Sequence, residues 1–489
     1  MVDRPDLEAV LRPRDDLVLE RQVEPGRFEA VAGPVWGYER RVEVEPLDDG
    51  RFRVEEALSA QPAVPFLSPL FDGELRRLLS RDDARPPWWA PPTRADRRAT
   101  IALWALSLAS LVGGYLTGLL TATITFAGTE FGAGAGAQGV AGVVVRFGGA
   151  AALVLTVAAA DRFGRRKVIL WSAALGCVAT AAGGAAPSLA WLTGTQAVGR
   201  SLGVALLICV AIQAVEEMPD GSRAYAVSVM GLSAGLGGAL AIGALPLADL
   251  GTAGWRLLYV LPVAGLVLLR WVARDLPESR RFEAPHGEAR LAGHGRRFWL
   301  LAVSAMLLSL LAAPAGFYAN RYLTTEHGFS AFDITLFAFV TGGPSIVGVV
   351  VGGRLADIRG RRPVGAVALV VSAVTAALFY LSSGAALWIW GLVGAVIGAA
   401  SLPALGVYGP ELFPTGLRGR AGGIIALTGL VGSAAGLLIA GFLADEVGSL
   451  GPAIAPLSIG PLLVAVLVLV AYPETAGSTL EDLNPEDRR

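Results

Sequence analysis

Two arginines interrupt long apolar stretches and are the first candidates for ligand chemistry. Arg146 lies in "GVVVRFGG" and Arg200 in "AVGRSLG", and no acidic residue stands near either of them. A guanidinium keeps its charge at any physiological pH and pairs well with planar anions. The two residues are therefore candidates for binding a carboxylate, sulfonate or phosphate. The alternative is that each side chain bonds backbone carbonyls or extends to a polar surface.

Further polar residues lie inside the same apolar stretches. Either they contact a solute, or they form hydrogen bonds between helices, which is the commoner role of a lone Tyr or Gln in such a stretch. As further candidates for solute binding we take Tyr115, Gln213, Tyr318 and Asn320.

A charged turn occurs twice, as "DRFGRRK" from residue 161 and as "DIRGRRP" from residue 357, 196 positions later. The glycine permits a tight turn, and the arginines can reach carboxylates or helix C-termini. We interpret the turns as latches across the seam between two halves; the alternative is that they anchor loops to anionic lipid. The residues concerned are Asp161, Arg162, Gly164, Arg165, Arg166, Asp357, Gly360, Arg361 and Arg362.

Long apolar helices must position these residues. The chain is 54% hydrophobic and 17% charged, and stretches of about twenty apolar residues, enough to cross about 30 Å of hydrocarbon, recur along it. The sequence predicts an all-α polytopic membrane protein with twelve transmembrane helices in two pseudo-symmetric six-helix bundles. The expected spans are 99–124, 139–160, 167–186, 189–215, 223–247, 253–274, 297–323, 332–354, 363–382, 385–409, 420–445 and 450–472.

The first part of the chain differs in composition, since residues 1–98 carry 36 of the 81 charged side chains. "GYERRVEVEPLDDGRFRVEEAL" predicts two strands around a "DDG" turn, and "PLFDGELRRLLSRDD" a short amphipathic helix. Trp88 and Trp89 of the linker are expected at the membrane surface. The expected domains are a small cytosolic α+β module (1–85), a Pro/Trp-rich linker (86–98), an N-terminal bundle (99–274), a loop (275–296), a C-terminal bundle (297–472) and a tail (473–489).

Cations decide the expected orientation. If the N-terminus is cytoplasmic, the arginines of both charged turns and of the 275–296 loop fall in cytoplasmic loops, while the outer loops hold almost none. This distribution follows the positive-inside rule. We therefore expect a multi-pass protein of the cytoplasmic (inner) membrane with both termini cytoplasmic.

Several motifs together resemble the major facilitator superfamily, in particular its sugar-porter branch. The charged turns look like the paired loop signature of that family, and the resemblance covers about residues 99–483. It implies alternating access and movement of solute without ATP. The other motifs are "GGYLTG" (113–118), "EEMPDGSRA" (216–224), "GWR" (254–256), "PESRRF" (277–282), "GPELFPTGLRGR" (409–420) and "YPETAGSTLEDL" (472–483).

The resemblance also implies a cytoplasmic charge network that governs gating. To the residues of the turns it adds Glu216, Arg223, Glu278, Arg280, Glu411, Arg418 and Glu474. The solute site departs from the family, because the places of its polar sugar ligands hold Gly231, Leu307, Leu308, Ala313 and Gly406. Leu116 replaces the aspartate of its proton-coupled members.

These observations predict a secondary active or facilitative transporter of a small, amphipathic, anionic organic solute. Two alternatives stay open: a proton-coupled sugar or metabolite symporter, and a transporter-derived sensor that signals through the N-terminal module. We expect no enzymatic activity, cofactor or metal. Partners are the solute and membrane lipid; a net charge of −1 argues against nucleic acid, and we expect a monomer.

Overall fold

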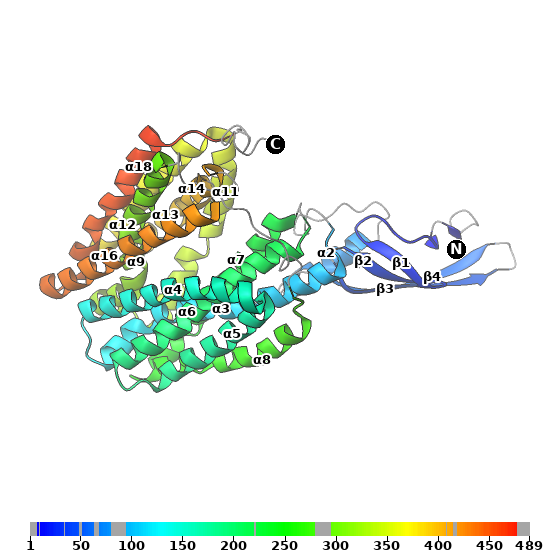
Figure 1. The fold of residues 1–489 in the computed structure, drawn as a ribbon, viewed down its shortest axis with the longest axis horizontal. Helices are drawn as coiled ribbons and strands as arrows, with labels where there is room; N and C mark the ends of the chain where they lie inside the picture. The colour runs from blue at the N-terminus through cyan, green and yellow to red at the C-terminus, as the bar shows by residue number, and fades with distance from the viewer. Residues whose placement is uncertain are drawn as a thin grey trace.

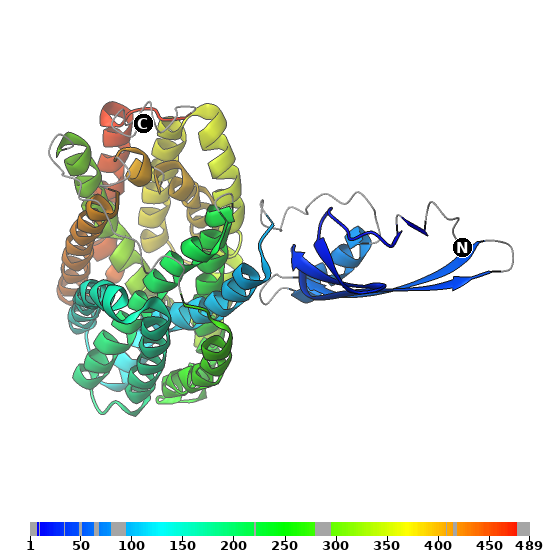
Figure 2. The ribbon, with the colours of Figure 1, turned by 45° about the vertical axis from the view of Figure 1, so that its right-hand side comes forward.

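The computed structural model describes residues 7–8, 10–33, 35–47, 51–62, 68–79, 94–219, 222–278, 295–406, 408–413 and 418–476. It consists of a small sheet-and-helix module near the N-terminus and a larger helical body (Figure 1). Figure 2 shows the module projecting from one end of the body, where helix α3 leads out of it. We call this end the module side and the opposite end the far side.

The module is a four-stranded antiparallel meander in the order β1-β2-β3-β4. Its last two strands form the expected hairpin, in which the Leu47 N–H donates to the Arg51 carbonyl at 2.9 Å. Leu75 and Leu79 of the amphipathic helix pack into its core beside Val18 and Val35. The elements are β1 (Leu19–Glu24), β2 (Arg27–Ala32), β3 (Val35–Pro46), β4 (Phe52–Pro62) and α2 (Ser68–Leu79).

A buried ion pair ties the start of the chain to this sheet. Arg40 lies 2.6 Å from Glu20, and their side chains are 3% and 0% exposed. Arg40 also donates to the carbonyls of Val10 and Arg12. The Tyr38 hydroxyl donates to Glu20, and its burial together with that carboxylate raises the pKa of Tyr38.

The module is joined directly to the first helix of the body. Gly33 donates its N–H to the Ala95 carbonyl at 3.1 Å, and Ala32 pairs with Asp96. The Asp96 side chain accepts from the Ala99 N–H, so it also caps α3. Helix α3 therefore begins at Arg97, inside the segment that we expected to be linker; Trp88 and Trp89 lie outside the described residues.

Each half of the body contains six membrane-length segments. The first half comprises α3 (Arg97–Glu130), α4 (Ala135–Phe163), α5 (Arg165–Ala182), α6 (Leu189–Glu217), α7 (Arg223–Gly243) followed by η3 (Leu245–Leu250), and η4 (Gly254–Tyr259) followed by α8 (Leu261–Asp275). The second half comprises α9 (Gly295–His327), α10 (Ala331–Phe337) with η5 (Ala338–Gly342) and α11 (Ser345–Arg359), α12 (Arg361–Leu381), α13 (Ala385–Ala399) with α14 (Ser401–Gly406), α16 (Arg418–Val447), and α17 (Leu450–Ile454) with η6 (Ala455–Ser458) and α18 (Ile459–Ala471).

These segments occupy the expected spans. Among the described residues, eleven helical segments are long and apolar enough to cross a membrane. The remaining expected span is α4, a helix of 29 residues in which the side chains of residues 151–162 are not described. Segments such as α10–α11 and α17–α18 are interrupted by short π or 3-10 turns.

The hydrophobic cores show where the two bundles meet. On the far side, one buried cluster contains residues of both bundles, including Leu119, Trp255, Tyr318 and Leu437. On the module side, each bundle has its own cluster, around Leu206 in the first bundle and around Leu369 in the second. The bundles are therefore packed together at the far side and form separate cores toward the module.

Two aspartates close the far side reciprocally. Asp445, at the end of α16, accepts from the N–H groups of Ala135 and Gly136 at 2.7 Å each, at the start of α4. Asp249, after α7, accepts from the N–H groups of Ala331 and Phe332 at 2.9 Å each, at the start of α10. The donors and the acceptors are both 196 positions apart, as the charged turns are. Each carboxylate of one bundle thus caps a helix N-terminus of the other.

We predict that Asp445→Asn opens the far side more often. An amide offers one oxygen and no charge, and losing a hydrogen bond to a charged group costs about 1.5–3 kcal/mol. A cysteine introduced at the buried Leu437 should then react faster with an impermeant maleimide added from the far side. The exposed neighbour substitution Glu446→Gln is the control; equal labelling rates in both variants would contradict the prediction.

Candidate functional site

The structure places Arg146 on the face of α4 that meets the second bundle. Gly139 and Gly142, on the same stripe, lie against Tyr318 and Phe317 of α9. The Arg146 guanidinium carbon is 5.3 Å from the centre of the Phe317 ring, and Nη1 donates to the Gly142 carbonyl at 3.2 Å. Arg146 is half-buried at the seam between the bundles, in a cation–π contact.

Arg200 lies on α6, between the face that packs on α4 and the face that packs on α3. Its neighbour Ser201 lies against Gly148 of α4, and Gly203 lies against Leu116 of α3. The side chain of Arg200 is half-buried, and its Nε is enclosed without a hydrogen-bond partner in the described structure. Arg146 lies on α4, which packs against α6, so the two positive charges are carried by adjoining helices of one bundle.

The positive charges of these two guanidinium groups are not balanced by an acidic side chain in the described structure. No described carboxylate forms a salt bridge with either group, and a buried cation is costly unless it is paired. An anion placed beside Arg200 would supply an acceptor for Nε. The site is therefore suited to a negatively charged ligand.

The positions at which the resemblance expects polar sugar ligands carry no polar side chain. Leu307 and Leu308 are partly buried against the core of the second bundle, and Ala313 packs on the far-side cluster. A Cβ added at Gly231 or Gly406 would meet no atom within 4 Å. These positions, at which the resemblance expects polar ligands, are apolar or border open space.

The other four candidates are held by backbone carbonyls. Tyr318 donates to the carbonyls of Ala135 and Leu437, and Asn320 to that of Ala122, so both join the bundles at the far side. Tyr115 donates to the Leu258 carbonyl at 2.7 Å, and Gln213 to the Pro277 carbonyl at 2.7 Å. In this state they form contacts between segments, which is the alternative that the sequence left open.

The duplicated turns have the same geometry in both bundles. Gly164 and Gly360 adopt φ of 92° and 98°, a region that favours glycine, and a helix starts directly after each. Glu278 accepts from the Arg166 N–H at 3.1 Å, and Glu474 accepts from the N–H groups of Arg361 and Arg362 at 2.9 and 3.1 Å. Both glutamates therefore cap the helix that follows the turn.

The arginines of the turns bind the ends of neighbouring helices. Arg166 donates to the Ala273 carbonyl of α8 at 2.6 Å, and Arg362 donates to the Val468 carbonyl of α18 at 3.2 Å. Arg165 pairs with Glu216 of α6, and Arg361 donates to the Thr475 hydroxyl at 2.8 Å.

The latch across the seam stays a prediction. In this state the contacts described for the turns lie within their own bundle, because the glutamate that caps each turn follows the last helix of the same bundle. Several expected residues of the charge network lie outside the described part of the structure: Arg280, and the side chains of Asp161, Arg162, Arg223, Asp357, Glu411 and Arg418.

Three residues that matter here were not among the candidates predicted from the sequence. Phe317 directly precedes Tyr318, and only the fold brings it to Arg146. Asp249 and Asp445 differ in number by 196, the offset of the charged turns. A search of the sequence for acidic residues 196 positions apart would have identified Asp249 and Asp445 as equivalent positions of the two halves.

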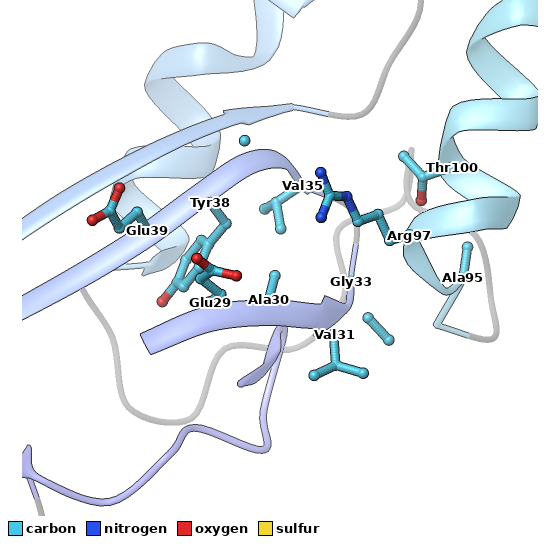
Figure 3. A pocket seen from close by; sticks show the side chains of 12 residues that line it. Glu29, Ala30, Val31, Gly33, Val35, Tyr38, Glu39, Ala95, Arg97 and Thr100 are labelled. Carbon is cyan, nitrogen blue, oxygen red and sulfur yellow. The ribbon is translucent and has the colours of Figure 1, made fainter. Parts of the chain in front are cut away.

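A cavity of about 340 Å³ lies where the module meets α3 (Figure 3). The paired residues of β2 and β3 end at Glu29 and Glu39, and the strands part beyond them. Arg97 and Thr100 of α3 line the other side of the hollow. The cavity is thus built from both the module and the first membrane helix.

Comparisons with known proteins agree with this architecture. Residues 106–397 and 313–487 match the model of the Major Facilitator Superfamily. The sialic acid transporter NanX of Escherichia coli is 25% identical over 306 residues, which cover 60% of this chain and 74% of NanX. A probable 4-methylmuconolactone transporter of Cupriavidus pinatubonensis is 26% identical over 369 residues, or 71% of this chain and 83% of the relative.

Solved structures share the fold. The xylose transporter XylE of E. coli, in an inward open conformation, superimposes with a TM-score of 0.66 at 17% identity, over 78% of this chain and 98% of XylE. The nucleoside transporter NupG gives a TM-score of 0.63 at 11% identity, over 76% of this chain and all of NupG. The family model spans well over half of the residues, so the chain is a multi-pass membrane transporter, not an enzyme, and belongs to the major facilitator superfamily.

Proposed function

We propose that this transporter moves a small, amphipathic organic anion, and that Arg200 and Arg146 bind its negative group. The observation that carries the proposal is the enclosed Nε of Arg200, which has no hydrogen-bond partner in the described structure. The cost of leaving such a cation unpaired falls when an anion binds. The apolar residues at the places of the family's polar sugar ligands suit the rest of an amphipathic solute, since sugar hydroxyls need fixed hydrogen-bond partners.

One of the relatives supports an anionic solute for this transporter, but the relatives together do not identify the solute. The name of NanX gives an acid, sialic acid, as the solute of that protein. The names of XylE and NupG give xylose and a nucleoside, so the shared fold accommodates solutes of several classes. The choice of an anion therefore rests on the two arginines of this chain.

We further infer that the module side is cytoplasmic and that solute binds from there in this state. The arginines of both duplicated turns lie at that side, as the positive-inside rule requires. The far side is closed by Asp249, Asp445, Tyr318 and Asn320. Alternating access would break these bonds and bring the module-side halves of the bundles together.

A sensor remains the second candidate, because the module is bonded to α3 through Gly33 and Ala95 rather than attached by a free linker. Movement of α3 would then be transmitted to the sheet. Solute flux in proteoliposomes distinguishes the two: a transporter accumulates or equilibrates solute, whereas a sensor binds it without flux.

Replacement of Arg200 by Gln should weaken binding of an organic acid about 10- to 150-fold, because a hydrogen bond to a charged group contributes about 1.5–3 kcal/mol. Sialic acid is a suitable probe, with a neutral hexose as a solute that should not bind. Binding and uptake are measured in proteoliposomes. Lys167→Gln, which removes a cation exposed at the module side, is the control, and full acid uptake by Arg200→Gln would contradict the assignment.

Uptake should depend little on an inward proton gradient. Every described Asp and Glu between residues 99 and 472 lies near a helix end or in a loop, and by the resemblance Leu116 occupies the place of the family's proton-coupling aspartate. The measurement compares uptake with and without an ionophore that collapses the gradient. Uptake that disappears with the gradient would show that a carboxylate outside the mid-membrane region carries the proton.

The capping glutamates should affect the rate of transport and not the affinity. Glu278→Gln and Glu474→Gln remove the charge that holds α5 and α12 to their turns, so each bundle should move less as a unit. We expect slower uptake at an unchanged apparent affinity for the solute. Asp275→Asn, beside the first cap, is the control. Normal transport rates in both glutamine variants would contradict the prediction and would favour the alternative that the turns only anchor loops to lipid.

A further inference from the structure

Helix α8 carries two adjoining hollows on its outer surface. The first, which we call the α8 groove, has a volume of about 1100 Å³ and lies between α3, α7 and α8, with Phe339 of the second bundle at its edge. The second, of about 410 Å³, is lined by Val267, Arg270, Trp271 and Arg274. Val267 lines both, so the two hollows adjoin each other along the helix.

The second hollow has the chemistry of a lipid headgroup site. Arg270, Trp271 and Arg274 follow Val267 at helical spacings of three, four and seven residues, so they share one face. Trp271 is 49% exposed, and the Arg274 side chain is 84% exposed and only 3.8 Å from Asp275 at its nearest. The structure describes no ion pair for Arg270. Arginines beside a tryptophan at the end of a membrane helix are typical of contact with anionic headgroups.

The first hollow has the chemistry of an acyl chain site. Its lining includes Leu116, Leu240, Leu261 and Leu268 and is almost wholly apolar. From Arg270 to Leu261, the far end of the groove on α8, the helix rises about 13.5 Å at 1.5 Å per residue. One leaflet of a hydrocarbon core that is about 30 Å thick has a similar depth.

We propose that a phospholipid with an anionic headgroup, from the leaflet on the module side, binds along α8. Its phosphate lies between Arg270 and Arg274, Trp271 lies at the headgroup level, and an acyl chain fills the α8 groove as far as Phe339. Charge complementarity and the matching length favour this lipid over a soluble anion. The site is separate from Arg146 and Arg200, and it does not depend on the identity of the solute.

Because Phe339 belongs to the second bundle, the chain in the groove contacts both bundles in this state. Phe339 lies in the π turn of η5, directly before α11 begins. A movement of the second bundle would carry Phe339 away from α3 and α8. The lipid should therefore be held more tightly in this state than in the one open to the far side.

The test uses the full-length protein and lipid retention, a readout that does not involve transport. Protein purified from mixed phosphatidylglycerol and phosphatidylcholine is examined by native mass spectrometry. We expect a preference for phosphatidylglycerol of roughly tenfold or more, given two arginines at the membrane surface. The double variant R270Q/R274Q should lose this preference, and Ala264→Trp, which fills the groove, should reduce retention of both lipids.

The double variant R296Q/K167Q removes two exposed cations from the module-side ends of other helices and should keep the preference. A phosphatidylglycerol with a photoreactive acyl chain should label residues 261–268 in the wild type and not in Ala264→Trp. An unchanged preference in R270Q/R274Q, equal loss in R296Q/K167Q, or labelling of the groove by a soluble photoreactive carboxylate in place of the lipid would overturn the proposal.

Discussion

An uncompensated guanidinium inside a membrane protein is the constraint on which the proposed anion site of this transporter depends. Arg200 cannot lose its charge, its Nε is enclosed without a hydrogen-bond partner in the described structure, and Arg146 adds a second cation at the seam. Arg200 lies on α6, whose neighbouring residues Ser201 and Gly203 pack on α4 and α3, and Phe317 of the other bundle covers Arg146. Both bundles therefore take part in the site, so a bound anion can influence the equilibrium between their arrangements.

The far side is closed by two equivalent contacts, one contributed by each bundle. Asp249 and Asp445 each cap a helix of the opposite bundle on the far side, whereas Glu278 and Glu474 each cap a helix of their own bundle on the module side. The first pair is broken when the bundles separate; the second pair can persist while they move. This difference fits rigid-body rocking, in which the bonds across the seam change and the bonds within each bundle hold it together.

Much of this architecture was predictable, because apolar length alone marks the spans and a charged turn at a fixed offset marks the duplication. The hairpin β3–β4 was also predictable, since its strands alternate around a "DDG" turn. Strands β1 and β2 were missed: four successive residues at the end of β1 are exposed, so the alternation on which strand prediction relies is absent.

The site was only half predictable. The two arginines were identified because charge in an apolar stretch is conspicuous. Tyr318 and Asn320 were expected at the solute, yet their polar atoms bond carbonyls across the seam. A sequence shows that a side chain is polar, but which carbonyl it meets depends on how the two bundles pack. The same limit applies to the charged turns, because their partners in this state, among them Glu216, Glu278 and Glu474, depend on how the helices of each bundle pack.

The central claim is that charge on the solute decides binding. The most direct measurement compares an organic acid with its uncharged amide, matched in shape, by equilibrium binding to the wild-type protein. Our account predicts that the acid binds and that the amide binds at least about tenfold more weakly, since the charge-assisted contact to Arg200 is lost. Equal affinity for the two would contradict it.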